Sequence, residues 1–539
     1  MTDHRHAAPL NASNLARLAP EHRPLADRQS LEPRLIHFGL GAFHRAHQAF
    51  YTELGNCASL SGSGTPNKAN GPDGLGEPGR AASANYPSET RGDEPRGPGW
   101  GIIALEPMAQ PVMEAFRRQD CYYSLSNRAP TDHQTRVIAS IIDAHLLTGQ
   151  DGSAAQLIAR SAISVVTLTI TEKGYPRTAG GGDLATNEPI IAHDLAATQP
   201  GADIWPRSAL GTLAFGLAAR FAANQAPLTV VSCDNMSSNG PTLARLINQF
   251  IALSGWPERA KLLSWLDQSV AFPATIVDRI VPATTAADRL AAEQAIGLRD
   301  DLPVFGEPYR QWVLEDSFRG PRPYWEAGGA SFVADVTPFE LTKLRLLNGS
   351  HSALAYLGLA AGYATVADVM NRSTWGETLV RGLAGEMALT LPPDGPHPAA
   401  YTAALISRFA NPAMAHRLQQ IGSDGSLKLP ERWVNPMRQL LARPLGSAPS
   451  HLTLAFAAWI NATKPGPDGR QVYGTSDPLT ADLARCWQGQ TGQTDLAKLT
   501  GVTAAALRLI GAPDLAEDLA LTRQVAGLIP AVAAGQIPL

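Results

Sequence analysis

The chain has 539 residues, of which 44% are hydrophobic and 17% are charged. This length is too great for one compact core, so the composition predicts a globular protein of two or three domains. The formal net charge of −4 excludes the broad basic surface that binds nucleic acid or an anionic membrane. The longest apolar stretch, at 164–170, is strand-sized, which excludes a membrane span, and no apolar segment follows the basic N-terminal residues as in a secretory signal.

Cysteine and histidine usage indicates a reducing compartment and no metal site. The four cysteines lie far apart, and no two of them share the CxxC spacing of a zinc site. The same spacings do not suggest a disulfide framework. The thirteen histidines include no HExxH pair. We therefore expect a cytoplasmic protein with no bound metal.

The first structural signal lies at residues 34–50, where an apolar run ends in Gly-Leu-Gly and a helix-like segment follows. This order is the strand–turn–helix opening of a dinucleotide-binding fold. Gly39 and Gly41 fit the first two positions of the GxGxxG motif, and Phe43 stands in the same turn. The third position holds His44 instead of glycine. We predict that Gly39, Gly41 and Phe43 bind the cofactor; the alternative is an ordinary strand–turn–helix.

A segment rich in small and turn-forming residues, 57–99, interrupts this fold. Gly, Pro and Ser fill 20 of its 43 positions, so it buries too little apolar surface to offset the entropy of ordering. A second apolar strand follows at 100–105. We therefore interpret 57–99 as a flexible insertion within a domain, and not as a linker between domains.

Glu106 ends this second strand, 65 positions after Gly41 and 22 positions after it when the insertion is left out. Dinucleotide sites place an acidic residue about 20 positions after the glycines, where it accepts hydrogen bonds from ribose hydroxyls. An acid here also repels the extra phosphate of NADP, so we expect NAD as the cofactor. The alternative is an exposed glutamate at a strand end.

Strand-like runs then alternate with helical patterns, at 164–170, 209–224, 228–232 and 242–253. This alternation predicts a parallel, doubly wound sheet, and hence an α/β, Rossmann-like domain over residues 1–329. The pattern over residues 330–539 is mostly helical, which predicts a helical domain that binds the substrate and carries catalysis. The helices expected there are 338–359, 399–409, 431–442, 451–462 and 514–532.

One predicted helix carries polar residues among leucines, in the sequence FELTKLRLLNGSHSALAYL of residues 339–357. At about 100° per residue, Asn348 lies roughly 140° and His351 roughly 80° from Lys343 around the helix. The three polar groups thus share one side of a largely apolar helix, which is costly unless they are paired or used. The alternative is a lysine that reaches solvent, with the asparagine and histidine satisfied locally.

These three residues fit hydride transfer to a carbonyl group, which creates an alkoxide that must be protonated. A lysine serves as both acid and base when burial lowers its pKa towards neutrality. Asn348 and His351 can donate hydrogen bonds to the developing oxyanion, so no metal is required. Glu340, one helical turn before Lys343, either relays its proton or complements the helix N-terminus.

Two further motifs stand beside apolar runs. The sequence SCDN at 232–235 follows a strand, at the carboxyl edge where α/β sheets bind ligands, so Asn235 is predicted to contact the cofactor and to orient the substrate oxygen. Asp278 and Arg279 interrupt the apolar run ATIVDRIVP. They form either a structural ion pair or a part of the active-site cleft.

Together these motifs resemble the mannitol dehydrogenase family, the polyol-specific long-chain dehydrogenases. The resemblance covers nearly the whole chain outside the insertion and rests on GLGAFHRAHQ, TEKGY, SCDN, VDRIVP, EPYRQWVLED and KLRLLNGSHS. It implies a Rossmann-like N-terminal domain, a helical C-terminal domain, no zinc and a catalytic lysine, which is Lys343 here. By the same match, Asn348 and His351 bind the oxyanion. The residues that match positions lining or serving the family's substrate cleft are Asn235, Asp278, Glu340 and Lys428.

Within this family the chain is most similar to the fructuronate reductase, or mannonate oxidoreductase, branch, because of the sequence HRLQQIGSDGSLKLP at 416–430. A planar guanidinium is a good partner for the carboxylate of a uronate. We therefore predict that Arg417, with His416 or Lys428, binds this carboxylate; the alternative is a residue on a surface helix. The branch implies interconversion of D-fructuronate and D-mannonate with NAD.

Two other functions stay open from the sequence. A neutral-polyol enzyme would act on mannitol or arabinitol, and a silent NAD-binding or regulatory protein would show no turnover. Retention of Lys343, Asn348 and His351 together argues against the silent protein. We expect a monomer that takes a small-molecule sugar acid or polyol and that binds neither nucleic acid nor a membrane.

Overall fold

The chain folds into two compact units, Met1–Val336 and Thr337–Leu539. The sequence predicts the boundary between residues 329 and 330, just before strand β12 (Ser331–Val333), which belongs to unit 1. The computed structural model describes residues 7–61, 98–107, 110–129, 133–148, 153–178, 182–198, 204–414, 416–443, 448–466, 468–488 and 495–539.

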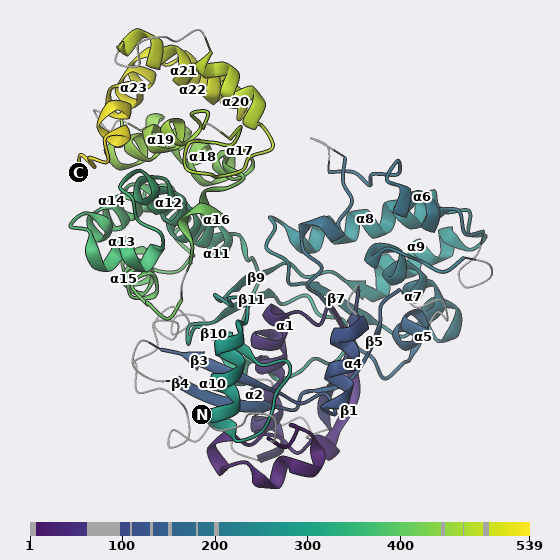
Figure 1. Ribbon diagram of the computed structural model, residues 1–539. Helices are drawn as coiled ribbons and strands as arrows, with labels where there is room; N and C mark the ends of the chain where they lie inside the picture. Colours follow the sequence, from purple (N-terminus) through teal and green to yellow (C-terminus); the bar gives the residue numbers. More distant parts are fainter. Residues whose placement is uncertain are drawn as a thin grey trace. The chain divides into compact units, whose positions relative to one another are not determined.

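Unit 1 is built around a six-stranded sheet of order β5-β2-β1-β6-β7-β8, in which neighbouring strands run parallel (Figure 1). Its strands are β1 (Leu31–Phe38), β2 (Gly99–Glu106), β5 (Ile141–Leu146), β6 (Val165–Leu168), β7 (Leu228–Ser232) and β8 (Val270–Ala271). The central strands are apolar and buried, as expected for parallel strands covered on both faces. The predicted Rossmann-like fold is confirmed, and the strand order reverses between β1 and β6, where such sheets bind ligands.

Helices cover both faces of this sheet, because successive side chains of a strand point to opposite faces. In β1, Leu35 belongs to one apolar core, whereas Ile36 and Phe38 belong to the other. The helices of unit 1 are α1 (Ala42–Ala46), α2 (Gln48–Ser61), α4 (Gln110–Arg118), α5 (Ser153–Ala159), α6 (Pro189–Leu195), α7 (Ala209–Ala223), α8 (Asn239–Leu253), α9 (Arg259–Ser269) and α10 (Ala286–Ile296). Short 3-10 turns are η2 (Ala12–Arg17), η3 (Pro20–His22), η4 (Arg28–Ser30), η5 (Glu172–Gly174) and η6 (Trp325–Gly328).

Two small sheets complete unit 1, and the sequence does not predict either of them. One has the order β10-β3-β4, and the other has the order β12-β11-β9. Their further strands are β3 (Tyr123–Arg128), β4 (His133–Ile138), β9 (Thr275–Asp278), β10 (Val304–Gly306) and β11 (Gln311–Glu315). Each sheet also pairs strands that lie far apart in the sequence, β10 with β3 in one and β11 with β9 in the other, and a local apolar pattern does not reveal such pairs.

The segment predicted as a flexible insertion, 57–99, is ordered at both of its ends. Helix α2 extends into its beginning, and β2 starts at its last residue. The side chain of Asn56 ties the two elements together, since its amide donates to Trp100 O at 2.9 Å and its oxygen accepts from Trp100 N at 2.8 Å. Both predicted boundaries are therefore corrected inwards. Residues 62–97 lie outside the described part of the chain.

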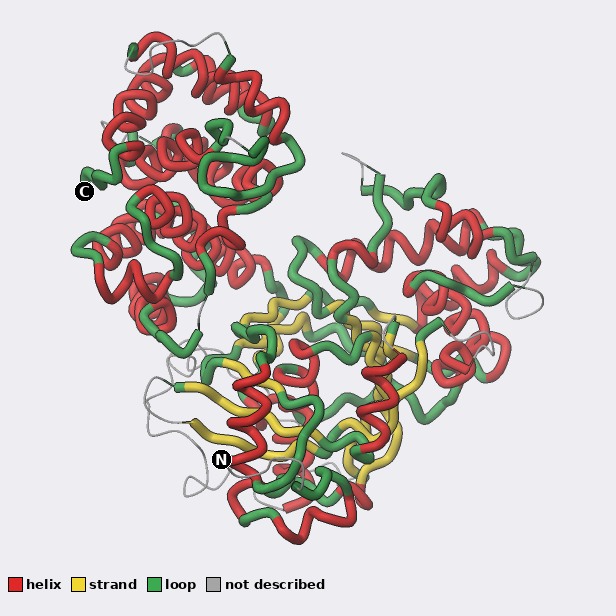
Figure 2. The backbone as a smooth tube through the Cα atoms, in the orientation of Figure 1, coloured by secondary structure: helices red, strands yellow, loops and turns green. Residues whose placement is uncertain are grey.

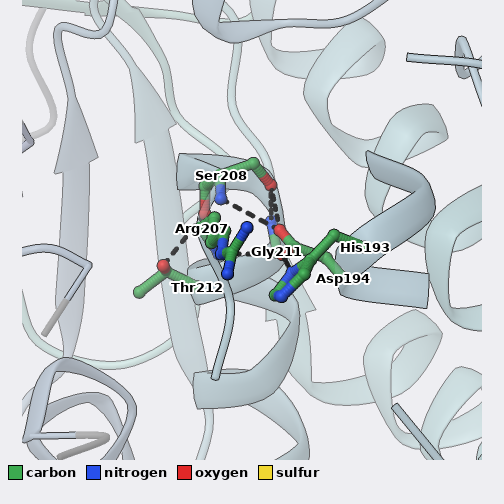
Figure 3. Close-up of polar contacts among 6 residues, drawn as sticks. All are labelled: His193, Asp194, Arg207, Ser208, Gly211 and Thr212. Carbon is green, nitrogen blue, oxygen red and sulfur yellow. Dashed lines mark hydrogen bonds and ion pairs between the residues drawn. The ribbon is translucent and has the colours of Figure 1, made fainter. Parts of the chain in front are cut away.

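A buried carboxylate, Asp194 on α6, anchors the N-terminus of α7 (Figure 3). Asp194 Oδ2 accepts from the backbone N of Ser208 at 2.9 Å and from its hydroxyl at 2.6 Å, and the serine oxygen accepts from Gly211 N at 2.8 Å. Asp194 Oδ1 accepts from Arg207 N at 2.8 Å and lies 3.0 Å from His193 Nδ1. The serine hydroxyl bonds to the carboxylate and not to the imidazole, so this group caps a helix and does not form a nucleophilic triad.

Unit 2 consists of helices around an apolar core, which confirms the predicted helical character (Figure 2). Its α-helices are α11 (Thr337–Thr342), α12 (Ser350–Ala360), α13 (Val366–Arg372), α14 (Gly376–Ala388), α15 (Pro398–Phe409), α16 (Leu418–Gly422), α17 (Gly425–Leu429), α18 (Asn435–Leu441), α19 (Ser450–Ala462), α20 (Thr480–Trp487), α21 (Leu496–Leu509), α22 (Pro513–Glu517) and α23 (Leu519–Ala533). None of the helices in the described ranges has the length and apolar character that a bilayer span requires.

Three predicted helices of unit 2 are interrupted. The segments predicted at 338–359 and 431–442 contain the π-helical stretches η7 (Lys343–Gly349) and η8 (Pro430–Val434). The segment predicted at 514–532 breaks at Asp518, because this side chain accepts from two backbone N–H groups of the next turn and so begins α23 as a new helix.

Candidate functional site

The glycine turn after β1 has the geometry expected of the first dinucleotide-binding motif. Gly39 has a φ of +116°, and a Cβ added there would lie 2.9 Å from Thr169 Oγ1, so only glycine fits between the ends of β1 and β6. Gly41 precedes α1, and an added Cβ would meet nothing within 4 Å among the described atoms. The turn is therefore closed towards β6 and open in front of Gly41, where a ligand can approach the backbone.

A buried pair of imidazoles fills the place of the third motif glycine. The His44 ring stacks on His37 with centroids 3.4 Å apart and an interplanar angle of 9°. His37 contacts Thr167 Oγ1 at 2.6 Å and Thr169 Oγ1 at 2.8 Å, whereas neither ring nitrogen of His44 has a hydrogen-bond partner in the described structure. Burial holds the pKa of both rings well below the ordinary histidine value, so both are neutral. Neighbouring Phe43 stacks on a third histidine of this segment.

Glu106 lies directly beside this turn. It is the last residue of β2, and the residue before it accepts from Gly39 N at 2.8 Å through its backbone carbonyl. The Glu106 side chain is only 8% exposed, which is contrary to the alternative of an exposed strand-end glutamate. The structure therefore brings the predicted acidic residue to the glycine turn despite the long segment between them.

The remaining predicted residues of unit 1 stand at strand ends. Asn235 is exposed and follows β7 at the carboxyl edge of the large sheet. Asp278 is buried and ends β9. Arg279 donates to the backbone carbonyl of Glu307 at 3.1 Å and also to the Ala46 carbonyl and the Asn127 side chain. These oxygens hold the Arg279 guanidinium in place, and both alternatives, a structural ion pair with Asp278 or a part of the active-site cleft, stay open.

In unit 2, the predicted catalytic residues lie in and just after the π-helical stretch η7. Lys343 is its first residue, Asn348 lies five positions later, and His351 follows in the first turn of α12. A π-helix closes its hydrogen bonds from i to i+5, so a turn takes more residues than in an α-helix. The estimate of 100° per residue is therefore wrong here. The wider turn places Lys343 and Asn348 closer together around the helix axis than an α-helix would, at a helix irregularity of the kind often found at functional sites.

The second π-helical stretch, η8, supplies hydrogen bonds to the first. Arg432 Nη1 donates to Ser352 Oγ at 2.8 Å and to Asn348 O at 3.4 Å, and Trp433 Nε1 donates to Gly349 O at 3.1 Å. A π-turn disrupts the regular α-helical ladder, so these side chains satisfy carbonyl groups that it leaves. Burial lowers the pKa of Arg432 to about 10. The sequence pattern does not single out Arg432, because this residue lies in a segment with the pattern of an ordinary surface helix.

His351 is 8% exposed and has unusual neighbours. Its ring stacks on Phe409 with centroids 5.1 Å apart and lies 4.7 Å from the ring of His416. Nε2 of His351 and Nδ1 of His416 are buried without a hydrogen-bond partner within the part of the chain that the structure describes. Burial is the main cause that holds the pKa of His351 well below its ordinary value. The His416 ring, when it takes a proton, and the positive side chains of Arg432, Arg408 and Lys428 lower it further.

The other predicted residues of unit 2 differ in their surroundings. Lys428 Nζ donates to Ser423 O at 2.6 Å, and burial lowers its pKa. Glu340 is partly buried in the first turn of α11, so the helix-dipole alternative for it stays open. Arg417 is exposed at the start of α16. The structure thus brings His416 and Lys428 towards His351, while the Arg417 side chain faces solvent.

The described residues contain no group of three or more His, Cys, Asp or Glu side chains that could hold a metal ion.

Two family models match the chain, the mannitol dehydrogenase Rossmann domain over residues 33–327 and the mannitol dehydrogenase C-terminal domain over residues 335–522. The chain belongs to the mannitol dehydrogenase family. The resemblance predicted from the motifs is confirmed.

The relatives that are similar to this chain are named for different substrates. D-mannonate oxidoreductase of Escherichia coli (strain K12) is 35% identical over 494 residues, covering 90% of this chain and 92% of the relative. Mannitol 2-dehydrogenase of Pyrenophora tritici-repentis (strain Pt-1C-BFP) is 32% identical over 517 residues, covering 93% and 82%. The solved ternary complex of Pseudomonas fluorescens mannitol 2-dehydrogenase with NAD and D-mannitol has a TM-score of 0.70 and 31% identity, covering 97% of this chain and 99% of that chain.

As a mannitol dehydrogenase family member, the protein is an oxidoreductase that acts on the CH–OH group of a sugar alcohol or a sugar acid. Identities of 35% and 32% differ too little to separate these two substrate classes. The choice between them therefore has to come from the chemistry of the site.

Proposed function

We propose that the protein is an NAD(H)-dependent dehydrogenase that interconverts D-fructuronate and D-mannonate, with Lys343 as acid and base and without a metal. The observation that carries this proposal is the positive surroundings of His351, whose buried Nε2 has no partner within the described ranges. Positive charge in a buried site attracts a carboxylate, whereas a neutral polyol gains nothing from it. Similarity to a D-mannonate oxidoreductase supports the same substrate class.

The catalytic roles follow from the chemistry of the side chains. NAD, when bound, accepts a hydride from the alcohol carbon, and NADH supplies one to the carbonyl carbon. During reduction, the Lys343 ammonium gives a proton to the substrate oxygen; during oxidation, the neutral amine takes that proton. Asn348 and His351 donate hydrogen bonds that stabilise negative charge on this oxygen. His351 is neutral because burial lowers its pKa, so one ring nitrogen donates and the other accepts.

NAD would be held by the glycine turn, with Gly39, Gly41 and Phe43 at the diphosphate and Glu106 at the ribose. The burial of Glu106 beside Gly39 supports this assignment. A carboxylate at the ribose also disfavours NADP. Replacing it, as Glu106→Gln, should raise kcat/KM with NADPH relative to NADH; an unchanged ratio would assign cofactor choice to another residue.

The substrate is tested by the rate of NADH oxidation with D-fructuronate and with D-fructose. We expect kcat/KM to be about 100-fold higher with D-fructuronate, because a site built around an anion discriminates strongly against a ligand without one. Equal or faster reduction of D-fructose would instead favour a mannitol or arabinitol 2-dehydrogenase. The similarity to mannitol 2-dehydrogenases favours this second candidate.

The residue that binds the carboxylate is tested separately. Lys428→Ala should raise KM for D-fructuronate, because Lys428 is one of the positive neighbours of His351; Arg417→Ala tests the predicted contribution of this exposed arginine, and Arg381→Ala, at an exposed arginine on α14, is its matched control. Unchanged kinetics in Arg417→Ala would remove this residue from the site and assign the carboxylate to His416 or Lys428. Asn235 and Asp278 stay predicted substrate-binding residues.

A further inference from the structure

Thr171 adopts a backbone conformation that is otherwise almost confined to glycine. Its φ is 61° and its ψ is 166°, a region that a β-branched residue strongly disfavours. Its side chain is exposed, so packing of that side chain does not account for the conformation. Thr171 follows β6 at the carboxyl edge of the large sheet, two positions after Thr169, which closes the glycine turn. Such outliers persist only where the surrounding structure holds them.

One carboxylate holds this conformation. Asp234 Oδ1 accepts from Thr171 N at 2.8 Å, and Oδ2 accepts from Ile170 N at 3.2 Å and from the Tyr175 hydroxyl at 2.6 Å. The Tyr175 oxygen also lies 2.7 Å from Ser232 Oγ. Asp234 and Tyr175 are 7% and 2% exposed, so these bonds are made away from water. The network explains why TEKGY and SCDN occur together: each motif supplies half of it.

The backbone of Asp234 is fixed as well, through its carbonyl group. Asp234 O accepts from the Asn239 side chain at 3.1 Å, and the same amide group bonds to Thr275 N at 2.9 Å and Thr275 O at 3.0 Å. The Thr275 hydroxyl in turn donates to Ser232 O at 2.7 Å. The peptide that joins Asp234 to Asn235 is therefore anchored to β9, and exposed Asn235 is presented from a rigid base.

We infer that Asp234 is a positioning residue: its carboxylate locks the loop after β6 and the loop after β7 into one arrangement at the carboxyl edge, so that hydride transfer depends on it. This is the edge at which doubly wound sheets bind dinucleotides. The strained residue Thr171 lies beyond the end of β6, so pairing of the strands in the sheet does not require its conformation. The inference rests on the dehydrogenase activity of the proposed function, but not on which sugar is the substrate.

The test compares Asp234→Asn with Asp194→Asn. Both variants convert a buried carboxylate with three N–H or O–H donors into an amide, which can no longer accept all of them. We expect kcat of Asp234→Asn to fall about 100-fold, as for a small misplacement of reacting groups, with little change in the Kd for NADH. In Asp194→Asn, kcat per folded molecule should stay at the wild-type value. Equal kcat values in the two variants would overturn the inference.

A second measurement separates positioning from general loss of structure. If Asp234 acts by holding Thr171 at a positive φ, then glycine at position 171, which adopts such a φ without strain, depends less on the Asp234 carboxylate. We expect Thr171→Gly to restore part of the kcat that Asp234→Asn loses, so that the fold-loss due to Asp234→Asn is smaller in the glycine background. Strictly multiplicative effects would contradict the inference. All rates are measured with whichever of D-fructuronate, D-fructose or D-mannitol wild type turns over fastest, so a wrong substrate assignment leaves this comparison intact.

Discussion

Two buried carboxylates in unit 1, Asp194 and Asp234, have nearly the same hydrogen-bond chemistry and very different effects on the backbone. Asp194 accepts from the residues that begin α7, and the N-cap Ser208 keeps an ordinary extended conformation with φ −93° and ψ 155°. Asp234 accepts from Thr171, which it holds at φ 61°. The first carboxylate holds the residue that caps the N-terminus of α7, which is a structural role. The second one holds Thr171, the residue before the 3-10 turn η5, in a strained conformation, so the backbone conformation distinguishes the proposed positioning group from the structural one.

The largest loss of kcat is expected for Lys343→Ala, and it gives the upper limit against which the two carboxylate variants are compared. Lys343→Ala should lower kcat by about 1,000-fold, because no other group is proposed to exchange the proton with the substrate oxygen. NADH binding should stay close to wild type, as measured by fluorescence titration, since Lys343 is not among the proposed cofactor-binding residues. The loss in Asp234→Asn should fall between this value and that of Asp194→Asn. Near-wild-type turnover in Lys343→Ala would assign acid–base catalysis to another residue.

Replacing Asp194, the carboxylate with a structural role, should lower the stability of the folded protein. Asp194→Asn leaves buried donors of Ser208 and Arg207 unsatisfied, so we expect the free energy of unfolding to fall by about 3 kcal/mol. Urea unfolding followed by far-UV circular dichroism measures this change. An exposed acid, as in Asp183→Asn, provides the control with little change. A loss of kcat in folded Asp194→Asn would break the distinction between the two carboxylates.

Acid pH affects the histidines of unit 1 and Asp234 in opposite directions. Burial lowers the pKa of His47 to about 3, so the folded state keeps this ring neutral while the unfolded chain takes a proton below pH 6.5. The contribution of His47 to the free energy of unfolding is therefore fully present above pH 6.5. It is lost as the pH falls from 6.5 towards 3, at about 1.4 kcal/mol per pH unit. Burial raises the pKa of Asp234, so the folded state binds that proton more tightly and acid adds stability there.

The histidine effect can be isolated with His47→Gln. The glutamine amide can replace the hydrogen bond of His47 Nε2 to Gln311 O, which is 3.0 Å long, but it does not titrate. Between pH 6 and pH 4, the slope of unfolding free energy against pH should be smaller than in wild type by about 1.4 kcal/mol per unit. An unchanged slope would mean that His47 does not titrate between the folded and unfolded states in this range.

The sequence predicts four strands of the central sheet, β1, β2, β6 and β7, because each is a short apolar run followed by turn residues, whereas the edge strands β5 and β8 are not predicted: β5 is interrupted by polar residues and β8 has only two residues. The ends of β2 and α2 are predicted less well, since the composition of 57–99 hides the helix that continues into it. Gly39 and Glu106 are recognised because their roles depend on residue type and on spacing after the insertion is removed. The small sheets stay invisible to such reasoning, because their partners, for example β3 and β10, are distant in sequence.

The site itself is predicted as a set of residue types, and its geometry is not. Lys343, Asn348 and His351 are predicted from their spacing and motif, but the π-helical turn that contains the first two of them accepts hydrogen bonds from Arg432 and Trp433, which lie in another helix. The bond between Asp234 and Thr171 joins residues 63 positions apart. Its only sequence signal is the joint occurrence of TEKGY and SCDN, and strain at Thr171 is a property of the backbone that no residue pattern records.

The smallest expected effect tests the strain directly. Thr171→Gly relieves a conformation that costs about 1–3 kcal/mol and adds the entropy cost of a glycine, about 1 kcal/mol, so the variant should be roughly 1 kcal/mol more stable than wild type. Thr186→Gly is the matched control: this threonine is also exposed and lies in unit 1, but its φ is not positive. There the entropy cost acts alone, so urea unfolding should show a loss of stability. The two threonine-to-glycine changes should therefore have opposite signs. If both destabilise the protein, Thr171 is not strained, and the conformational argument that separates Asp234 from Asp194 fails.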